Sequence, residues 1–244
     1  MSILIFNILA VSDQQQNTMK VVGLVSGGKD SCYNMVYCVA AGHEITCLAN
    51  LRPREDTCHE TGDNYQSQYL MINYTILDSP MYQTIGWNSV CMIAEAMELP
   101  LYVETVTGDS VSVGQDYQPE SGDEVEDLFR LLSRVKQETG VTGVSVGAIL
   151  SNYQRVRVES VCLRLGLTPL AYLWQRDQAE LLQEMIRDGM ESVLVKVACL
   201  GLERKHLGQT LAEMRPELVK LSDKFGVNVC GEGGELRQPI RDQY

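Results

Sequence analysis

The sequence lacks several features that would place it in common classes of protein. Its eight cysteines include no C-x-x-C pair, so neither a paired-cysteine zinc site nor a disulfide framework is expected. The apolar run Ile3–Val11 has no basic residues before it and is much shorter than the roughly 20 residues that span a bilayer. The net charge of −12 provides no general basic field for nucleic acid.

What the sequence does contain is enough apolar material for a core. Hydrophobic residues make up 45% of the 244 residues, which favours one domain plus a smaller second one. We expect an extension over 1–18, a main domain over 19–168 with a loop or insert at 54–78, and a smaller, truncated domain over 169–244. Single cysteines inside apolar runs favour a reduced, cytoplasmic protein.

One stretch, Val21–Ser31, combines a strand, a glycine loop and the start of a helix. The apolar residues Val21–Val25 fit a buried parallel strand, and two glycines after them permit a tight turn and a close approach to a ligand. A helical pattern begins at Asp30 and stops at Gly42. Because free N–H groups and the helix dipole both favour negative charge, this arrangement predicts a phosphate site.

Two phosphate-loop motifs compete for this stretch. The hydrolase loop G-x4-G-K-[ST] matches from Gly23 to Lys29, but Asp30 replaces the hydroxyl that binds magnesium. The motif S-G-G-x-D-S matches at every fixed position over Ser26–Ser31. A glycine turn without a ligand is the third interpretation, but it leaves the hydroxyls, the Asp and the Lys beside Gly-Gly unexplained.

Strands alternate with helices along the whole chain, which predicts an α/β fold: a Rossmann-like parallel sheet with helices on both faces. The expected strands are 21–25, 44–51, 101–106, 143–150, 168–173, 192–200 and 227–230. Capping boxes are expected to begin helices at Ser121, with a solvated acidic first turn, and at Ser151. In such sheets ligands bind at the carboxyl ends of the strands, where Asn50 and Gly147 also lie.

Taken together, these segments resemble the diphthine–ammonia ligase family, whose members are ATP pyrophosphatases of the adenine-nucleotide-alpha-hydrolase type. The resemblance covers most of 19–235. It is carried by SGGKDS from Ser26, SVGAILSNYQR from Ser145, LWQR from Leu173 and GEGGE from Gly231. SGGKDS alone indicates only the superfamily, whereas the combination is specific to this family and its archaeal relatives.

The resemblance implies a cytoplasmic, ATP-dependent ligase. Such an enzyme uses ammonium to amidate the carboxylate of diphthine, a modified histidine of translation elongation factor 2, and so forms diphthamide. The carboxylate attacks the α-phosphorus of ATP and pyrophosphate leaves; ammonia then attacks the acyl-adenylate and AMP leaves. ATP, Mg²⁺ and ammonium are implied, with elongation factor 2 as the partner and neither membrane nor direct nucleic-acid binding. The 19–168 domain is then the ATP pyrophosphatase domain and 169–244 the substrate-binding domain.

The nucleotide site is expected to consist of the glycine loop and two strand-end residues. Its expected members are Ser26, Gly27, Gly28, Lys29, Asp30, Ser31, Asn50 and Gly147. Lys29 is expected to counter phosphate charge and to act in catalysis. Asp30, also an expected catalytic residue, either ligates Mg²⁺, which prefers oxygen ligands, or caps the helix.

The substrate site is expected to come from later parts of the chain: Ser151, Tyr153, Arg155, Trp174, Gly233 and Gly234. Trp174 either faces a quaternary ammonium or belongs to the core, and Arg155 has Glu159 as an alternative partner one helical turn away. Glu232 and Glu235 are expected to be catalytic. They bind the trimethylammonium group, attract ammonium or take its proton, unless this segment is a solvated glycine turn.

Three segments depart from the family pattern. Residues 1–18 are extra, about 57–76 looks like an insertion, and the chain after Glu235 does not continue as the family does. Two other functions therefore stay open. One is a tRNA-modifying ATP pyrophosphatase, although such enzymes often carry C-x-x-C pairs or a basic domain. The other is a catalytically impaired nucleotide-binding isoform, which the altered C-terminus favours.

Overall fold

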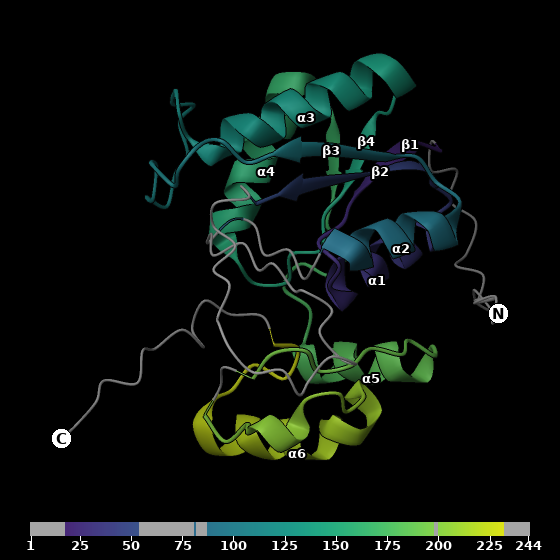
Figure 1. The fold of residues 1–244 in the computed structure, drawn as a ribbon, viewed down its shortest axis with the longest axis vertical. Coiled ribbons are helices and arrows are strands. Elements are labelled where there is room, and N and C mark those ends of the chain that lie inside the picture. Colours follow the sequence, from purple (N-terminus) through teal and green to yellow (C-terminus); the bar gives the residue numbers. More distant parts are fainter. Residues whose placement is uncertain (1–17, 54–80, 82–86, 198–199, 232–244) are drawn as a thin grey trace, which may run out of the picture. The chain divides into compact units, whose positions relative to one another are not determined.

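The fold is built on one parallel sheet (Figure 1), seen in a computed structural model that describes residues 18–53, 81, 87–197 and 200–231. The sheet has five strands in the order β3-β2-β1-β4-β5. Their bounds are β1 Lys20–Leu24, β2 Glu44–Arg52, β3 Leu101–Thr105, β4 Gly143–Ser145 and β5 Thr168–Leu170. All neighbouring strands pair in parallel. The predicted α/β fold is confirmed, and the strand order reverses between β1 and β4, where such sheets bind ligands.

Helices cover both faces of the sheet (Figure 1). The helices α1 (Lys29–Ala40) and α2 (Trp87–Met97) lie on one face, and α3 (Glu124–Thr139) and α4 (Asn152–Leu165) lie on the other. The larger core cluster joins the apolar face of α3 to residues of β1, β2 and β4. Burying each large apolar side chain contributes about 1.5–3 kcal/mol, so these contacts hold the layers together.

A single buried amide ties α1 to the two strands beyond the reversal. Asn34 is fully buried; its Nδ2 donates to Ser145 Oγ and to the Leu170 carbonyl, both at 2.8 Å. Its Oδ1 accepts from the Tyr172 N–H at 2.8 Å. All the hydrogen-bonding capacity of the amide group except one lone pair is therefore used to fix α1 against the ends of β4 and β5.

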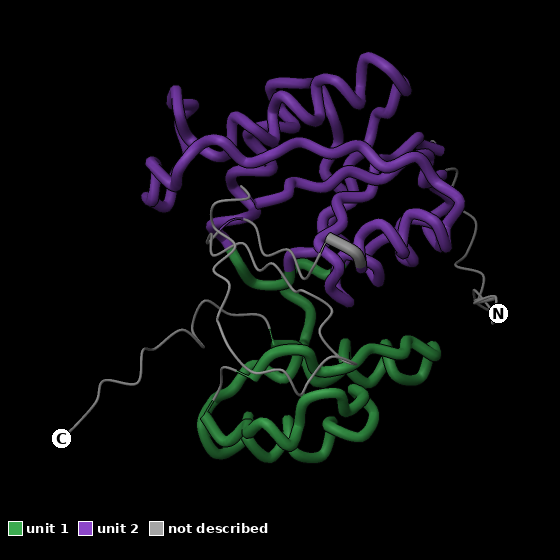
Figure 2. The backbone as a smooth tube through the Cα atoms, viewed as in Figure 1, with its two compact units in different colours: residues 1–8, 149–151, 173–244 green, residues 9–148, 152–172 purple. Residues whose placement is uncertain are grey.

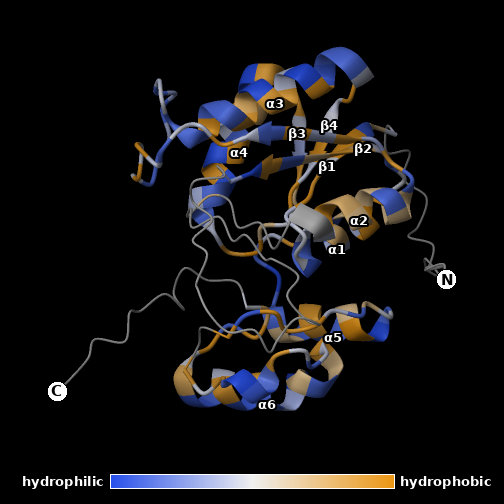
Figure 3. Ribbon diagram, in the orientation of Figure 1, coloured by the Kyte–Doolittle hydropathy of each residue, from blue (hydrophilic) through white to orange (hydrophobic). Residues whose placement is uncertain are grey.

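The chain forms two compact units (Figure 2). Among the described residues, one unit holds 149–151 and 173–231, and the other holds the sheet and its helices. The smaller unit contains α5 (Gln178–Arg187), the short 3₁₀ helix η2 (Arg204–His206) and α6 (Leu211–Phe225). Both α5 and α6 carry hydrophobic and hydrophilic bands (Figure 3), and their buried residues include Leu182 and Met214. Amphipathic helices of this kind bury one face against each other.

Two predicted strands are wrong in their described parts. Residues 192–197 form one isolated bridge, between Val193 and Thr210, and their backbone bonds go to the segment that leads into α6. Residues 227–230 form a turn in which the Gly231 N–H donates to the Asn228 carbonyl at 2.9 Å. The apolar residues there are buried without a strand, because Cys230 bonds to Gln178 at the start of α5 rather than to a sheet.

The start of α3 also differs from its prediction. The helix α3 begins after Asp123, whose side chain accepts from the Val125 N–H, and not at Ser121. Its acidic first turn is not solvated, because Asp123, Glu124 and Asp127 are all buried. The helix α6 begins at Leu211, after the N-cap residue Thr210, which forms a capping box with Glu213. Pro216 lies inside it.

None of the helices in the described ranges combines the length and the apolar composition needed to cross a membrane.

Replacing Asn34 by Ala should lower the free energy of unfolding by about 2–4 kcal/mol, because the Tyr172 N–H and the buried Ser145 hydroxyl lose the amide as a partner and each loss costs about 1–3 kcal/mol. Chemical denaturation monitored by circular dichroism measures the change. The control is Val39→Ala on the same helix, which is 44% exposed and should change stability by no more than about 0.5 kcal/mol. Equal effects of the two substitutions would contradict the role assigned to the Asn34 amide.

Candidate functional site

The predicted phosphate loop lies at the end of β1, at the reversal of strand order. Gly27 has φ +83°, a left-handed conformation that favours glycine, and Gly28 is the N-cap of α1. The Ser31 hydroxyl donates to the Gly28 carbonyl at 2.9 Å, and the Gly28 N–H donates to Ser26 Oγ at 3.4 Å. The two serines thus fix the backbone of the loop ahead of the helix N-terminus, where free N–H groups favour an anion.

The charged residues of the loop pair with each other. Lys29 Nζ lies 2.8 Å and 2.9 Å from the two carboxylate oxygens of Asp30, with side chains that are 12% and 22% exposed. The lysine charge is therefore balanced inside the loop. Burial also raises the pKa of the neighbouring Cys32 thiol, which argues against a thiolate nucleophile at this helix start.

Gly147, expected in the nucleotide site, packs directly on the loop. A Cβ atom at this position would lie 2.6 Å from the Ser31 nitrogen and 2.8 Å from the Asp30 carbonyl carbon. Both are backbone atoms that cannot move aside as a flexible side chain can. Gly147 therefore brings the chain after β4 into contact with the first turn of α1.

Asn50, the other strand-end residue of the expected site, is buried at the carboxyl end of β2. Its Nδ2 donates to the Val25 carbonyl at 2.7 Å, directly before the loop. Its Oδ1 is buried and has no hydrogen-bond partner among the residues that the structure describes. A buried acceptor without a donor is costly, so this oxygen fits a ligand that supplies an N–H or O–H group.

The metal expected at Asp30 finds few protein ligands. In the described part of the chain, no group of three or more His, Cys, Asp or Glu side chains could hold a metal ion. Asp30 therefore belongs to no group of three or more such ligands within the described residues. This fits Mg²⁺, which usually takes one or two carboxylates and completes its shell with waters and substrate phosphates.

The residues expected to bind substrate are not brought together in one described unit. Tyr153 and Arg155 lie on α4 in the sheet unit, whereas Ser151 and Trp174 belong to the smaller unit. Arg155 pairs with Glu159 at 2.8 Å, which is the local alternative that its spacing allowed.

The remaining expected site residues, Glu232, Gly233, Gly234 and Glu235, lie outside the described residues.

Sequence reasoning missed a buried arginine that fixes the loop after β3. Arg157 is fully buried and donates to the carbonyls of Ser112, of Gly114 at 3.1 Å and of Tyr153 at 3.0 Å. Its guanidinium lies 3.3 Å from the centroid of the Tyr153 ring. A buried guanidinium needs acceptors for its N–H groups, and here it has three backbone carbonyls and an aromatic face as partners. No motif marks this residue, since its main partners are more than 40 positions away.

The acidic first turn of α3 holds the same loop from the other side. Asp127 accepts from the N–H groups of Thr107 at 2.7 Å and Gly108 at 2.9 Å, and it also pairs with Arg130. Asp123 accepts from the Ser112 N–H at 2.9 Å. The loop 107–123 therefore follows the carboxyl end of β3 in a fixed conformation. The Asp-Glu-Val-Glu-Asp run was the available signal, but helix-dipole reasoning assigned it to solvent.

The parallel sheet, its reversal point and the Ser-Gly-Gly-Lys-Asp-Ser loop define an α/β protein with a candidate phosphate-binding site at the reversal of strand order.

Comparison with known proteins identifies the family within this class. The diphthamide synthase N-terminal domain matches residues 19–169, and the diphthamide synthase C-terminal domain matches residues 177–243. The chain therefore belongs to the diphthamide synthase family, as its motifs predicted.

Individual relatives agree with this assignment. The diphthine–ammonia ligase of Danio rerio is 59% identical over 89% of this chain and 80% of its own length. That of Homo sapiens is 55% identical over 89% of this chain and 76% of its own length. Among solved structures, the U34-tRNA thiolase NcsA of Methanococcus maripaludis is 16% identical with a TM-score of 0.38, over 86% of this chain and 68% of its own. A likeness this weak carries no argument.

Replacing Gly147 by Ala should displace the loop, because the added methyl group would overlap the backbone of Asp30 and Ser31. We expect a loss of about 1–3 kcal/mol in unfolding free energy and weaker ATP binding by calorimetry. The control is Gly114→Ala, whose Cβ would meet only an oxygen at 3.6 Å and should leave both quantities nearly unchanged. Full ATP affinity in the Gly147 variant would show that the loop tolerates the displacement.

Proposed function

We propose that this chain is an ATP-dependent ligase that uses ammonium to convert the carboxylate of diphthine, on translation elongation factor 2, to the amide of diphthamide. The observation that carries the proposal is the match of both family domains along one chain that also has a complete phosphate loop at the sheet reversal. Diphthine–ammonia ligases that are 55% and 59% identical to this chain over 218 residues support the same reaction. We further propose that the enzyme acts in the cytoplasm.

The reaction has two proposed steps. A carboxylate oxygen of diphthine attacks the α-phosphorus of ATP, and the bond between the α-phosphorus and the bridging oxygen breaks to release pyrophosphate. Ammonia then attacks the acyl carbon of the acyl-adenylate, and the bond from that carbon to the AMP oxygen breaks. Adenylation is needed because a carboxylate oxygen is otherwise a poor leaving group. Ammonium gives up one proton before the attack and the new amide nitrogen loses another.

The phosphate loop is the proposed holder of the departing pyrophosphate. Backbone N–H groups at the start of α1 and the hydroxyls of Ser26 and Ser31 are placed where they can donate to phosphate oxygens. Lys29 would exchange Asp30 for a phosphate oxygen and so counter the charge that develops on pyrophosphate. The same exchange would leave Asp30 available to hold Mg²⁺, which would supply positive charge to the phosphates. Asn50 and Gly147 complete the proposed nucleotide site.

The substrate side of the site is proposed from the sequence. Glu232 and Glu235 are the proposed groups that attract ammonium, take its proton or face the trimethylammonium of diphthine, with Gly233 and Gly234 between them. Ser151, Tyr153, Arg155 and Trp174 are proposed substrate contacts. Tyr153 already donates its hydroxyl to the Ser112 carbonyl at 3.4 Å, so its proposed contact would be made by the ring.

The nucleotide product tests the reaction. Incubation with ATP, ammonium and elongation factor 2 that carries diphthine should produce AMP and pyrophosphate in step with diphthamide, measured by chromatography and by mass spectrometry of the modified peptide. Factor without diphthine is the control. ADP as the main product would restore the hydrolase-loop interpretation, whereas AMP formation that depends on tRNA would favour the tRNA-modifying alternative.

Replacing Lys29 by Ala should slow turnover by about 10- to 150-fold, since a hydrogen bond to a charged group is worth about 1.5–3 kcal/mol and each factor of ten about 1.4 kcal/mol. The matched control is Lys20→Ala, because Lys20 lies exposed at the opposite end of β1 and should not affect turnover. Undiminished activity in a folded Lys29 variant would remove the loop from the mechanism.

A further inference from the structure

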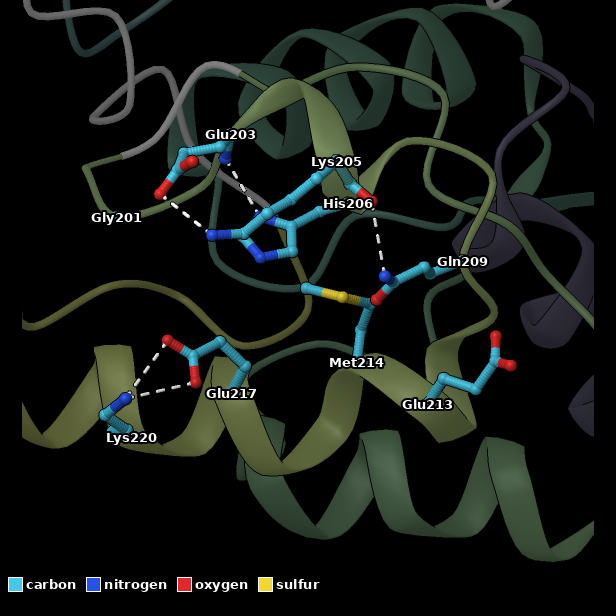
Figure 4. A pocket seen from close by; sticks show the side chains of 9 residues that line it. All are labelled: Gly201, Glu203, Lys205, His206, Gln209, Glu213, Met214, Glu217 and Lys220. Carbon is cyan, nitrogen blue, oxygen red and sulfur yellow. Dashed lines mark hydrogen bonds and ion pairs between the residues drawn. The ribbon is translucent and has the colours of Figure 1, made fainter.

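The smaller unit contains a hollow that the proposed reaction does not use. It has a volume of about 520 Å³ and lies between the segment 201–209 and the exposed side of α6. Figure 4 shows His206 and Lys205 projecting from one wall, Glu217 and Lys220 from α6 on the other, and Met214 between them. All of these residues belong to one compact unit.

The hollow has a fixed hydrogen-bond donor inside it. His206 is buried, with 8% of the residue exposed, and its Nδ1 accepts from the Glu203 N–H at 2.9 Å. In a neutral imidazole the other nitrogen then carries the proton. Nε2 faces the hollow (Figure 4) and has no hydrogen-bond partner among the described residues. A ligand that offers an oxygen acceptor would satisfy this donor.

Both walls of the hollow carry a charge pair. Lys205 Nζ lies 3.1 Å from Glu203 Oε1, and Lys220 Nζ lies 3.2 Å from Glu217 Oε2. Both lysine side chains are about two-thirds exposed, and exposed pairs of this kind contribute only about 0–1 kcal/mol. The pairs can therefore open at little cost to meet a ligand, and each offers one positive and one negative group.

This pattern selects against a ligand with one sign of charge. A simple anion would accept from His206 and the lysines but would face the carboxylates of Glu203, Glu213 and Glu217. A simple cation would face the lysines and leave the His206 donor without a partner. Like charges placed together in this way reject a ligand. We propose that the hollow binds a small zwitterionic group, in which a carboxylate accepts from His206 Nε2–H and Lys205 while an alkylammonium pairs with Glu217.

Two kinds of ligand carry such a zwitterionic group. If the proposed function holds, on which this link rests, the diphthine side chain is itself a zwitterion with a carboxylate and a trimethylammonium group. A free amino acid or betaine has the same two groups. The hollow would then be either a site that first recognises the modified residue, apart from the site where its carboxylate reacts, or a separate site for a small metabolite.

The binding test uses the whole wild-type chain with ¹⁵N-labelled histidine and probes of known charge. Glycine betaine should shift the ring resonances of His206, whereas acetate and tetramethylammonium at the same concentration should shift them much less. His43 is the internal control, because it is buried and its Nε2 already meets the Tyr172 hydroxyl at 3.0 Å. No shift with betaine, or an equal shift with acetate, would overturn the proposal.

The second arm separates the two sources. His206→Phe keeps a ring but removes the donor, and His206→Gln keeps an N–H donor. If the modified residue is the ligand, the Phe variant should raise KM for diphthine-bearing elongation factor at least about tenfold with kcat little changed, the Gln variant should restore part of the loss, and betaine should compete. An unchanged KM together with the betaine shift would assign the site to a free zwitterion. A wild-type chain without ligase activity would refute the proposed function, and the titration would still decide the hollow.

Discussion

The contact between the chain after β4 and the start of α1 sets the geometry on which the rest of the candidate site depends. At Gly147 the chain after β4 lies so close to the first turn of α1 that an added methyl group would overlap the helix backbone. On the same helix, Asn34 donates to the Ser145 hydroxyl and to the Leu170 carbonyl at the end of β5. The phosphate loop is therefore held from both sides of the strand reversal. Contacts at the carboxyl ends of the strands set the shape of the loop, and the loop residues contribute only the hydroxyls, the glycines and the charges.

The parts of the fold that could be predicted from sequence are those whose pattern is local. Val21–Val25 reads as a buried strand because it is short, apolar and followed by glycines, and the α3 positions repeat at helical spacing. The run 192–200 has a similar apolar pattern, yet its described part makes only one bridge, at Val193. An apolar composition indicates that a segment can be buried. Whether the segment also forms a strand depends on a neighbouring strand that can pair with it, and that strand comes from residues far away in the chain.

The same distinction separates the site residues that the sequence identified from those that it missed. The loop Ser26–Ser31 is a contiguous motif, so its chemistry was visible. Arg157 bonds to Ser112, and Asn34 bonds to Ser145 and Tyr172, at separations between 45 and 138 positions along the chain, so no local pattern could indicate these two residues. Asp127 was visible as part of an acidic run but assigned to solvent, because its backbone partners in the loop after β3 were unknown.

The way the chain passes between its two units limits how the protein can be divided. The smaller unit takes residues 149–151 from the middle of the chain, and Ile149, which is fully buried, accepts from the Gln175 N–H at 2.8 Å. A fragment cut at Leu173 would lose that acceptor. Gln175, which has φ +56°, would then have to keep a strained turn without its support. Dissection of this protein into separately expressed pieces therefore requires a circularly permuted or linker-joined design rather than a simple truncation.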